Sequence, residues 1–243
     1  SSPESSPGTC RRVSCSPSQP RLAFPFRSGA PLRSVEFVQQ VQARPAEARD
    51  VDAATGNTAL HFACCGAAPL SVVEALLRAW PEAAALADTG GNFPVMGAVA
   101  NGCDADTVQA LLKAYPKGAE AKMGGEHTLL HQACCNSASP AVVEVLLRAW
   151  PEAARETDHE GNTALHFAAA MQAHPEVVNQ VITAYPEACQ QRGKMNRYPL
   201  SLAFLREAPP ESVALIRDAF PSAMRDECMH ADWINHGIPN VLS

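Results

Sequence analysis

The sequence lacks the features that define several large protein classes. No run of apolar residues approaches the roughly 18 that a membrane-spanning helix needs, so we expect no transmembrane segment, and membrane contact only through a partner complex. The catalytic signatures G-x-S-x-G and H-E-x-x-H and the phosphate-binding P-loop are also missing. We therefore expect a protein that is not an enzyme and that uses no cofactor.

Positive charge is scarce outside the N-terminal segment. The 243 residues carry 19 Lys and Arg against 25 Asp and Glu, a formal net charge of −6. Residues 1–34 hold five arginines and one glutamate, which leaves 14 basic against 24 acidic residues in the remainder. Nucleic-acid binding needs clustered Lys and Arg because it neutralises phosphates. The acidic remainder therefore argues against nucleic acid as the main partner.

The nine cysteines do not form the pattern of a small secreted disulfide scaffold. They are spread along the chain, and four of them stand as two adjacent pairs. This distribution favours mostly free thiols in a reducing compartment. We therefore expect an intracellular protein, cytoplasmic by default.

Residues 1–34 differ in composition from the rest of the chain. They contain nine Ser and six Pro and show no periodic apolar face, which predicts a flexible or extended tail. A Ser- and Arg-rich, acid-poor segment is also typical of transit peptides, so a plastid or a mitochondrion stays open as the location. If a partner surface holds the tail, the stretch LAFPF would anchor it. The predicted anchor residues are Arg21, Leu22, Phe24 and Phe26.

What is abundant is internal repetition with a period of 35 residues. An aromatic residue followed by proline recurs at this interval, and the tetrapeptide TALH (58–61) returns at the same interval as FPVM, TLLH, TALH and YPLS. Each unit reads as a turn, a short helix of small residues, a loop and a longer apolar helix that the aromatic–proline pair ends. The aromatic residues are Trp80, Tyr115, Trp150, Tyr185 and Phe220, and we expect them to form a packing ladder.

The T-x-L-H start and the VVEALL or VVEVLL second helix resemble the ankyrin repeat family, although the usual ankyrin unit has about 33 residues. The resemblance implies an all-α helix-turn-helix solenoid of five full repeats with a half cap at each end. It also implies that His61, His131 and His166 tie the first helix to a neighbouring backbone. The expected parts are a tail (1–34), an N-terminal capping helix (35–52), repeats at 53–87, 88–122, 123–157, 158–192 and 193–227, and a C-terminal half cap (228–243).

Two stretches, HFACC (61–65) and HQACC (131–135), suggest metal binding at first sight. Each places a histidine three and four residues before two cysteines, and zinc favours both ligand types. However, sister units carry Ala or Val at the cysteine positions. The two stretches are also two units apart, roughly 20 Å at helix-packing distances of about 8–10 Å. We therefore expect buried packing positions and no metal site, and keep a Cys/His metal or redox protein as a minor alternative.

Function in a repeat array is expected at positions that vary between units. Two sets vary here, the residue after the histidine position and the loop before each Gly-Asn turn. Because ankyrin repeats bind proteins through the equivalent surfaces, the resemblance implies a non-enzymatic scaffold for a protein partner. The alternative is an accessory or linker subunit of a large organellar or membrane-associated assembly, anchored by the basic tail. The candidate contacts are Phe62, Gln132, Phe167, Leu202, Asp88, Lys122, Met123, Asp158, His159, Arg192, Lys194 and Met195.

Overall fold

The computed structural model describes residues 34–124 and 126–222, which form two compact units, 34–123 and 124–222. Among the described residues, no helix is long and apolar enough to cross a membrane. Three predictions lie outside the described residues: the tail up to residue 33, its anchor at Arg21, Leu22, Phe24 and Phe26, and the half cap 228–243.

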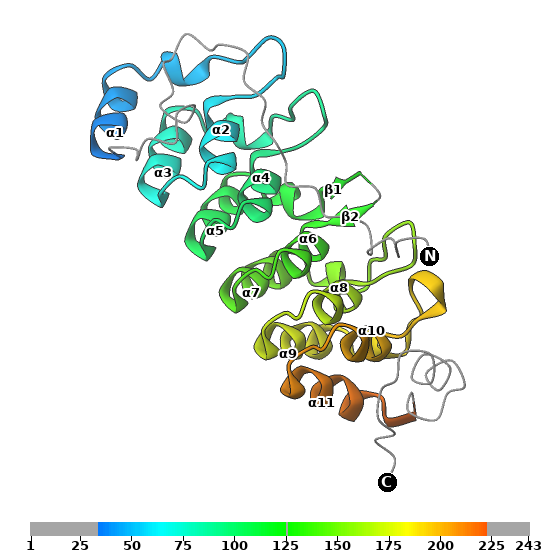
Figure 1. Cartoon of the computed structure of the whole chain (residues 1–243). Helices are drawn as coiled ribbons and strands as arrows, with labels where there is room; N and C mark the ends of the chain where they lie inside the picture. The colour runs from blue at the N-terminus through cyan, green and yellow to red at the C-terminus, as the bar shows by residue number, and fades with distance from the viewer. Residues whose placement is uncertain (1–33, 125, 223–243) are drawn as a thin grey trace, which may run out of the picture. The chain divides into compact units, whose positions relative to one another are not determined.

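The first unit contains two rows of helices (Figure 1). Helices α1, α3 and α5 pack side by side in one row, and α2 packs against α4 in the other. Each short helix also packs against the longer helix that follows it. The elements are α1 (Ser34–Ala43), the 3₁₀ turn η2 (Glu47–Arg49), α2 (Ala59–Cys65), α3 (Leu70–Ala79), η3 (Pro81–Ala85), α4 (Pro94–Ala100), α5 (Ala105–Ala114), η4 (Pro116–Glu120) and the two-residue strand β1 (Lys122–Met123).

The second unit repeats this arrangement. The short helices pack in the order α6, α8, α10 and the longer helices in the order α7, α9, α11. The predicted all-α, ankyrin-like helix-turn-helix architecture is therefore confirmed. The elements are the two-residue strand β2 (His127–Thr128), α6 (Leu129–Cys135), α7 (Pro140–Ala149), η5 (Pro151–Ala154), α8 (Ala164–Ala170), α9 (Pro175–Ala184), η6 (Pro186–Gln190), η7 (Lys194–Asn196), α10 (Pro199–Leu205) and α11 (Pro210–Ala219).

A threonine and a histidine together begin the short helices α2, α6 and α8. The threonine side chain accepts the histidine backbone N–H, and the histidine Nδ1 accepts the threonine backbone N–H, a capping box that satisfies two donors at the helix start. Helices α4 and α10 begin instead with Pro94 and Pro199, since proline at the first helical position needs no N–H partner.

The other nitrogen of each histidine ring reaches the next repeat. His61 Nε2 lies 3.0 Å from the carbonyl oxygen of Asn92. In the second unit, His166 Nε2 lies 3.3 Å from the carbonyl oxygen of Arg197. Because Nδ1 accepts an N–H and Nε2 faces a carbonyl, Nε2 carries the proton and the ring is neutral. The histidine therefore joins its own helix start to the turn of the following repeat.

The longer helices from α3 to α11 end at the aromatic residues. Trp80 has φ −152° and ψ 82°, and Tyr115 has φ −137° and ψ 83°, outside the helical region. The following proline disfavours helical geometry in the residue before it. A single 3₁₀ turn of four or five residues then follows, except after α11, where the described chain stops at residue 222. The sequence predicted the helix end but not this 3₁₀ turn.

The adjacent cysteines of HFACC and HQACC have separate structural roles. Cys64 and Cys134 are buried free thiols, whereas Cys65 and Cys135 are disulfide-bonded. Burial raises the pKa of the Cys134 thiol to about 12, which disfavours the thiolate that a metal would bind. The expectation of mostly free thiols holds for four of the six cysteines in the described residues.

Candidate partner-binding surface

The side chain after the histidine position points into the packing between helices. Phe62 is 8% exposed, Gln132 is 3% and Phe167 is 2%. The Phe167 ring lies edge-on to His131, with ring centroids 5.6 Å apart. The prediction that these three residues contact a partner is therefore wrong, because small residues in the short helices bring neighbouring helices close and this position fills the space between them. Leu202 is half-buried.

Two of the predicted loop residues, Asp88 and Asp158, stabilise the turns themselves. Asp88 Oδ1 accepts the backbone N–H groups of Gly90 and Asn92, both at 2.8 Å. Asp158 Oδ1 accepts those of Glu160 at 2.9 Å and Asn162 at 2.8 Å. Asp side chains hold turns in this way by substituting for a backbone acceptor. Their recurrence in the repeat thus has a structural explanation that needs no partner.

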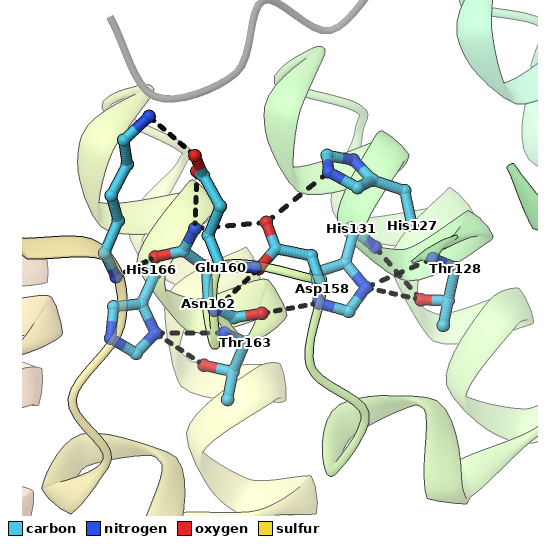
Figure 2. Close-up of polar contacts among 9 residues, drawn as sticks. His127, Thr128, His131, Asp158, Glu160, Asn162, Thr163 and His166 are labelled. Carbon is cyan, nitrogen blue, oxygen red and sulfur yellow. Dashed lines mark hydrogen bonds and ion pairs between the residues drawn. The ribbon is translucent and has the colours of Figure 1, made fainter. Parts of the chain in front are cut away.

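In the second unit, hydrogen bonds and an ion pair join the turn at 158–162 to the turn at 193–197 (Figure 2). The backbone N–H of Lys194 donates to Asn162 Oδ1 at 2.9 Å, and the Lys194 ammonium lies 2.7 Å from Glu160 Oε1. Asn162 Nδ2 donates to Asp158 Oδ2 at 3.0 Å. These contacts fix two consecutive turns of the array relative to each other.

Met195 is the most exposed large apolar side chain of these turns, with 70% of its surface accessible. Its backbone is left-handed (φ 58°, ψ 25°), and Asn196 also has a positive φ of 61°. Such a conformation is uncommon for residues other than glycine. The turn therefore directs an apolar side chain outward at some cost in backbone energy.

Arg192, three residues before Met195 in the sequence, is held by the aromatic ring of Tyr198. Its guanidinium carbon lies 4.7 Å from the centroid of the Tyr198 ring, and its Nε donates to the Tyr198 hydroxyl at 3.1 Å. Stacking of this kind orders the guanidinium before any partner arrives. We call His159, Glu160, Arg192, Lys194 and Met195 the turn surface; three of these residues are half-buried, and His159 and Met195 are exposed.

The predicted contacts Lys122 and Met123 belong to the first unit, where Lys122 is exposed and Met123 is half-buried. The predicted aromatic residues Trp80, Tyr115, Trp150, Tyr185 and Phe220 are all half-buried. Tyr115 packs 5.3 Å from Phe93, and Phe220 packs 5.7 Å from Tyr198. Tyr185 stacks with Arg155, whose guanidinium carbon lies 5.5 Å from the ring. These rings thus pack against residues of the repeat scaffold.

One cluster was not predicted from the sequence. His127, Asp158 and His159 bring three potential ligand atoms within 4.8 Å of one another. His127 Nε2 lies 3.4 Å from Asp158 Oδ2. Figure 2 draws this contact as a dashed line between the two side chains. A signal existed in the repeat alignment, because His127 occupies the position at which other units carry Asn57, Asn92 or Asn162.

Comparison with known families agrees with this architecture. The family description "Ankyrin repeats (3 copies)" matches residues 95–192, and "Ankyrin repeat" matches residues 55–85. The chain belongs to the ankyrin repeat family. No curated protein matches the sequence.

A solved structure shares the fold. It is that of the Bd0816 predatory endopeptidase from Bdellovibrio bacteriovorus in complex with the immunity protein Bd3460. One chain of that structure is similar to this one with a TM-score of 0.59 and 22% sequence identity, over 74% of this chain and 89% of that chain. At this level of identity the similarity establishes the fold alone.

Proposed function

We propose that the chain is a non-enzymatic scaffold that binds a protein partner through the turn surface of its second unit. The main support is Met195, whose left-handed backbone exposes an apolar side chain to solvent. Arg192 and Lys194 stand three residues and one residue before it in the sequence, and they are held by contacts with Tyr198 and Glu160 respectively. Because these contacts already order the two charged side chains, those side chains lose little further entropy when a partner binds, and Met195 supplies apolar surface for the partner to bury.

Family membership supports the same proposal. Ankyrin repeats are typically binding modules, and the complex named above shows this fold in a structure that contains two proteins.

The hydrogen bonds of Asp158 support the non-enzymatic part of the proposal. Its carboxylate accepts two backbone N–H groups and so stabilises its own turn. Such a carboxylate is poorly placed to act as a general base.

The test begins with identification of the partner. The tagged full-length chain is purified from its native source, and proteins that co-purify are identified by mass spectrometry. The affinity of the recombinant partner is then measured for the wild type and for two variants, Met195→Asp and Lys194→Glu. We expect each substitution to weaken binding at least about tenfold, equivalent to about 1.4 kcal/mol.

A matched control is Arg148→Glu on helix α7. Arg148 is an exposed cation of the same unit that forms an ion pair with Glu144 of its own helix. We expect Arg148→Glu to change the affinity by less than about twofold, because an exposed ion pair contributes little free energy. If Arg148→Glu weakens binding while Met195→Asp and Lys194→Glu do not, the row of longer helices is the interface and the proposal is wrong.

A further inference from the structure

The repeat scaffold explains Asp158 but not the two histidines beside it. Asp88 makes the same turn contacts as Asp158, and the residues 70 positions before His127 and His159 are Asn57 and Thr89. The turn around Asp88 therefore forms without either histidine. His127 and His159 are additions specific to one place in the array, where they meet at a single carboxylate.

The separation of the ligand atoms suits a metal ion. His127 Nε2 and Asp158 Oδ2 are 3.4 Å apart, longer than the 2.7–3.2 Å of ordinary N–H···O hydrogen bonds. Two ligands of a tetrahedral ion with bonds of about 2.0–2.1 Å are separated by about 3.3 Å. The third ligand atom, on His159, lies within 4.8 Å of both.

Two of the three side chains are already held in place. The Asp158 side chain is 1% exposed, and its Oδ1 accepts two backbone N–H groups, so that Oδ2 faces His127. The His127 side chain is 12% exposed, and its ring packs 5.1 Å from that of Phe167. Supporting contacts of this kind orient ligands around protein-bound metals. Exposed His159 gives an ion a route from solvent.

The nearby charges do not oppose a cation. Glu160 lies next to the cluster in sequence, and its carboxylate pairs with the Lys194 ammonium at 2.7 Å. That pair neutralises the closest lysine of the following turn. The cluster itself offers two imidazoles and one carboxylate, a donor set that suits zinc rather than magnesium or calcium, which prefer oxygen ligands alone.

We propose that His127, Asp158 and His159 form a binding site for a divalent transition metal, with zinc as the expected ion. The three side chains supply two nitrogen ligands and one oxygen ligand, and a fourth tetrahedral position remains for water or for a donor from another protein. This inference does not depend on the proposed partner surface, since metal binding is measured on the chain by itself.

The test is calorimetric titration of the full-length chain with Zn²⁺, after accessible thiols have been blocked with N-ethylmaleimide. Two ligand variants restore the residues of a sister unit, His127→Asn and His159→Thr, and so preserve the scaffold. His174→Asn is the matched control, because His174 is an exposed histidine of the same unit that caps α9. Circular dichroism melting in EDTA checks that all three variants fold.

We expect one strong Zn²⁺ site per chain in the wild type. Each ligand variant should bind at least about tenfold more weakly, the minimum effect of disturbing a metal's surroundings, and His174→Asn should bind within about twofold of the wild type. Co²⁺ should give the visible absorption of a tetrahedral site in the wild type and lose it in His127→Asn. Absence of stoichiometric Zn²⁺ binding, or equal binding by folded ligand variants, would overturn the proposal and leave His127 and Asp158 as an ion pair only.

Discussion

The Nε2 atom of His131 lies 3.1 Å from the carbonyl oxygen of Asn162, in the turn of the following repeat. Nδ1 of the same ring accepts the backbone N–H of Thr128 at 3.3 Å. One buried imidazole thus accepts a backbone N–H at a helix start and donates to a carbonyl in a turn 31 residues further along the chain. The Nδ1 contact requires the neutral ring, because a protonated Nδ1 cannot accept the Thr128 N–H, and this makes the array sensitive to acid.

The first prediction concerns stability between neutral and acidic pH. Burial lowers the pKa of His131 and of His166 from 6.5 to about 4. Between these values the unfolded chain binds more protons than the folded chain, so the free energy of unfolding falls as the pH decreases from about 6.5 to about 4. Each histidine accounts for about 3 kcal/mol over the whole interval.

Urea unfolding of the wild type at pH 7, 6, 5 and 4.5, followed by circular dichroism, checks this prediction. The folded variant His166→Gln should show a shallower decline, because glutamine does not titrate. A free energy of unfolding that stays constant from pH 7 to pH 4.5 would contradict the presence of neutral, buried histidines at the helix caps.

The second prediction separates the two contacts of the histidine. Thr128→Ala removes only the side-chain cap of α6 and should cost about 1 kcal/mol. His131→Ala removes the cap partner and the bond to the Asn162 carbonyl, which keeps only the backbone N–H of Asp158 as donor, and it empties a buried ring position, so it should cost about 2–4 kcal/mol. Chemical denaturation of both single variants and the double variant checks this. Equal costs for the two single variants would show that the bond between repeats contributes little.

The third prediction concerns Gly193 in the turn before α10. A Cβ atom at this position would lie 2.3 Å from Asn162 Oδ1 and 2.9 Å from His166 Nε2. Gly193→Ala must therefore displace the His166 contact with the next turn, at a cost of about 1–3 kcal/mol. Gly124→Ala is the control, because no atom lies within 4 Å of its added Cβ. If both variants melt at the wild-type temperature, the turn is not packed as described.

The fourth prediction concerns thiol reactivity. Burial raises the pKa of Cys103 and of Cys189 to about 11 and that of Cys134 to about 12. Since the thiolate is the reactive form, these three residues should remain unmodified in the native protein at pH 8. Iodoacetamide labelling followed by peptide mass spectrometry should detect them only after addition of guanidinium. Rapid labelling of Cys134 in the native state would contradict its burial.

Much of the fold could be predicted from the sequence because each repeat carries residues that mark where its helices begin and end. The aromatic residue before each proline marks the end of a longer helix, and Trp80 and Tyr115 leave the helical region there. The helix caps could also be predicted, since Thr128 and His131 stand at the spacing of a capping box. Local chemistry of this kind depends on residues close together in the chain.

The candidate site was less predictable because it depends on packing between repeats. Variation at Phe62, Gln132 and Phe167 suggested a surface, yet these side chains are buried. The cluster of His127 with Asp158 and His159 was not predicted either, because it joins residues about one repeat apart. Asn162 occupies the same position as His127 in the following repeat, and its side chain reaches the backbone of Lys194 in the next turn. Side chains at this position therefore contact the neighbouring repeat, which the sequence of one repeat does not reveal.

The most direct test of the proposed function is amide hydrogen exchange of the full-length chain with and without its purified partner. The account predicts that binding slows exchange in the turns at 157–162 and 192–197 and leaves helices α7, α9 and α11 unchanged. Slower exchange confined to the longer helices, with the two turns unaffected, would contradict it.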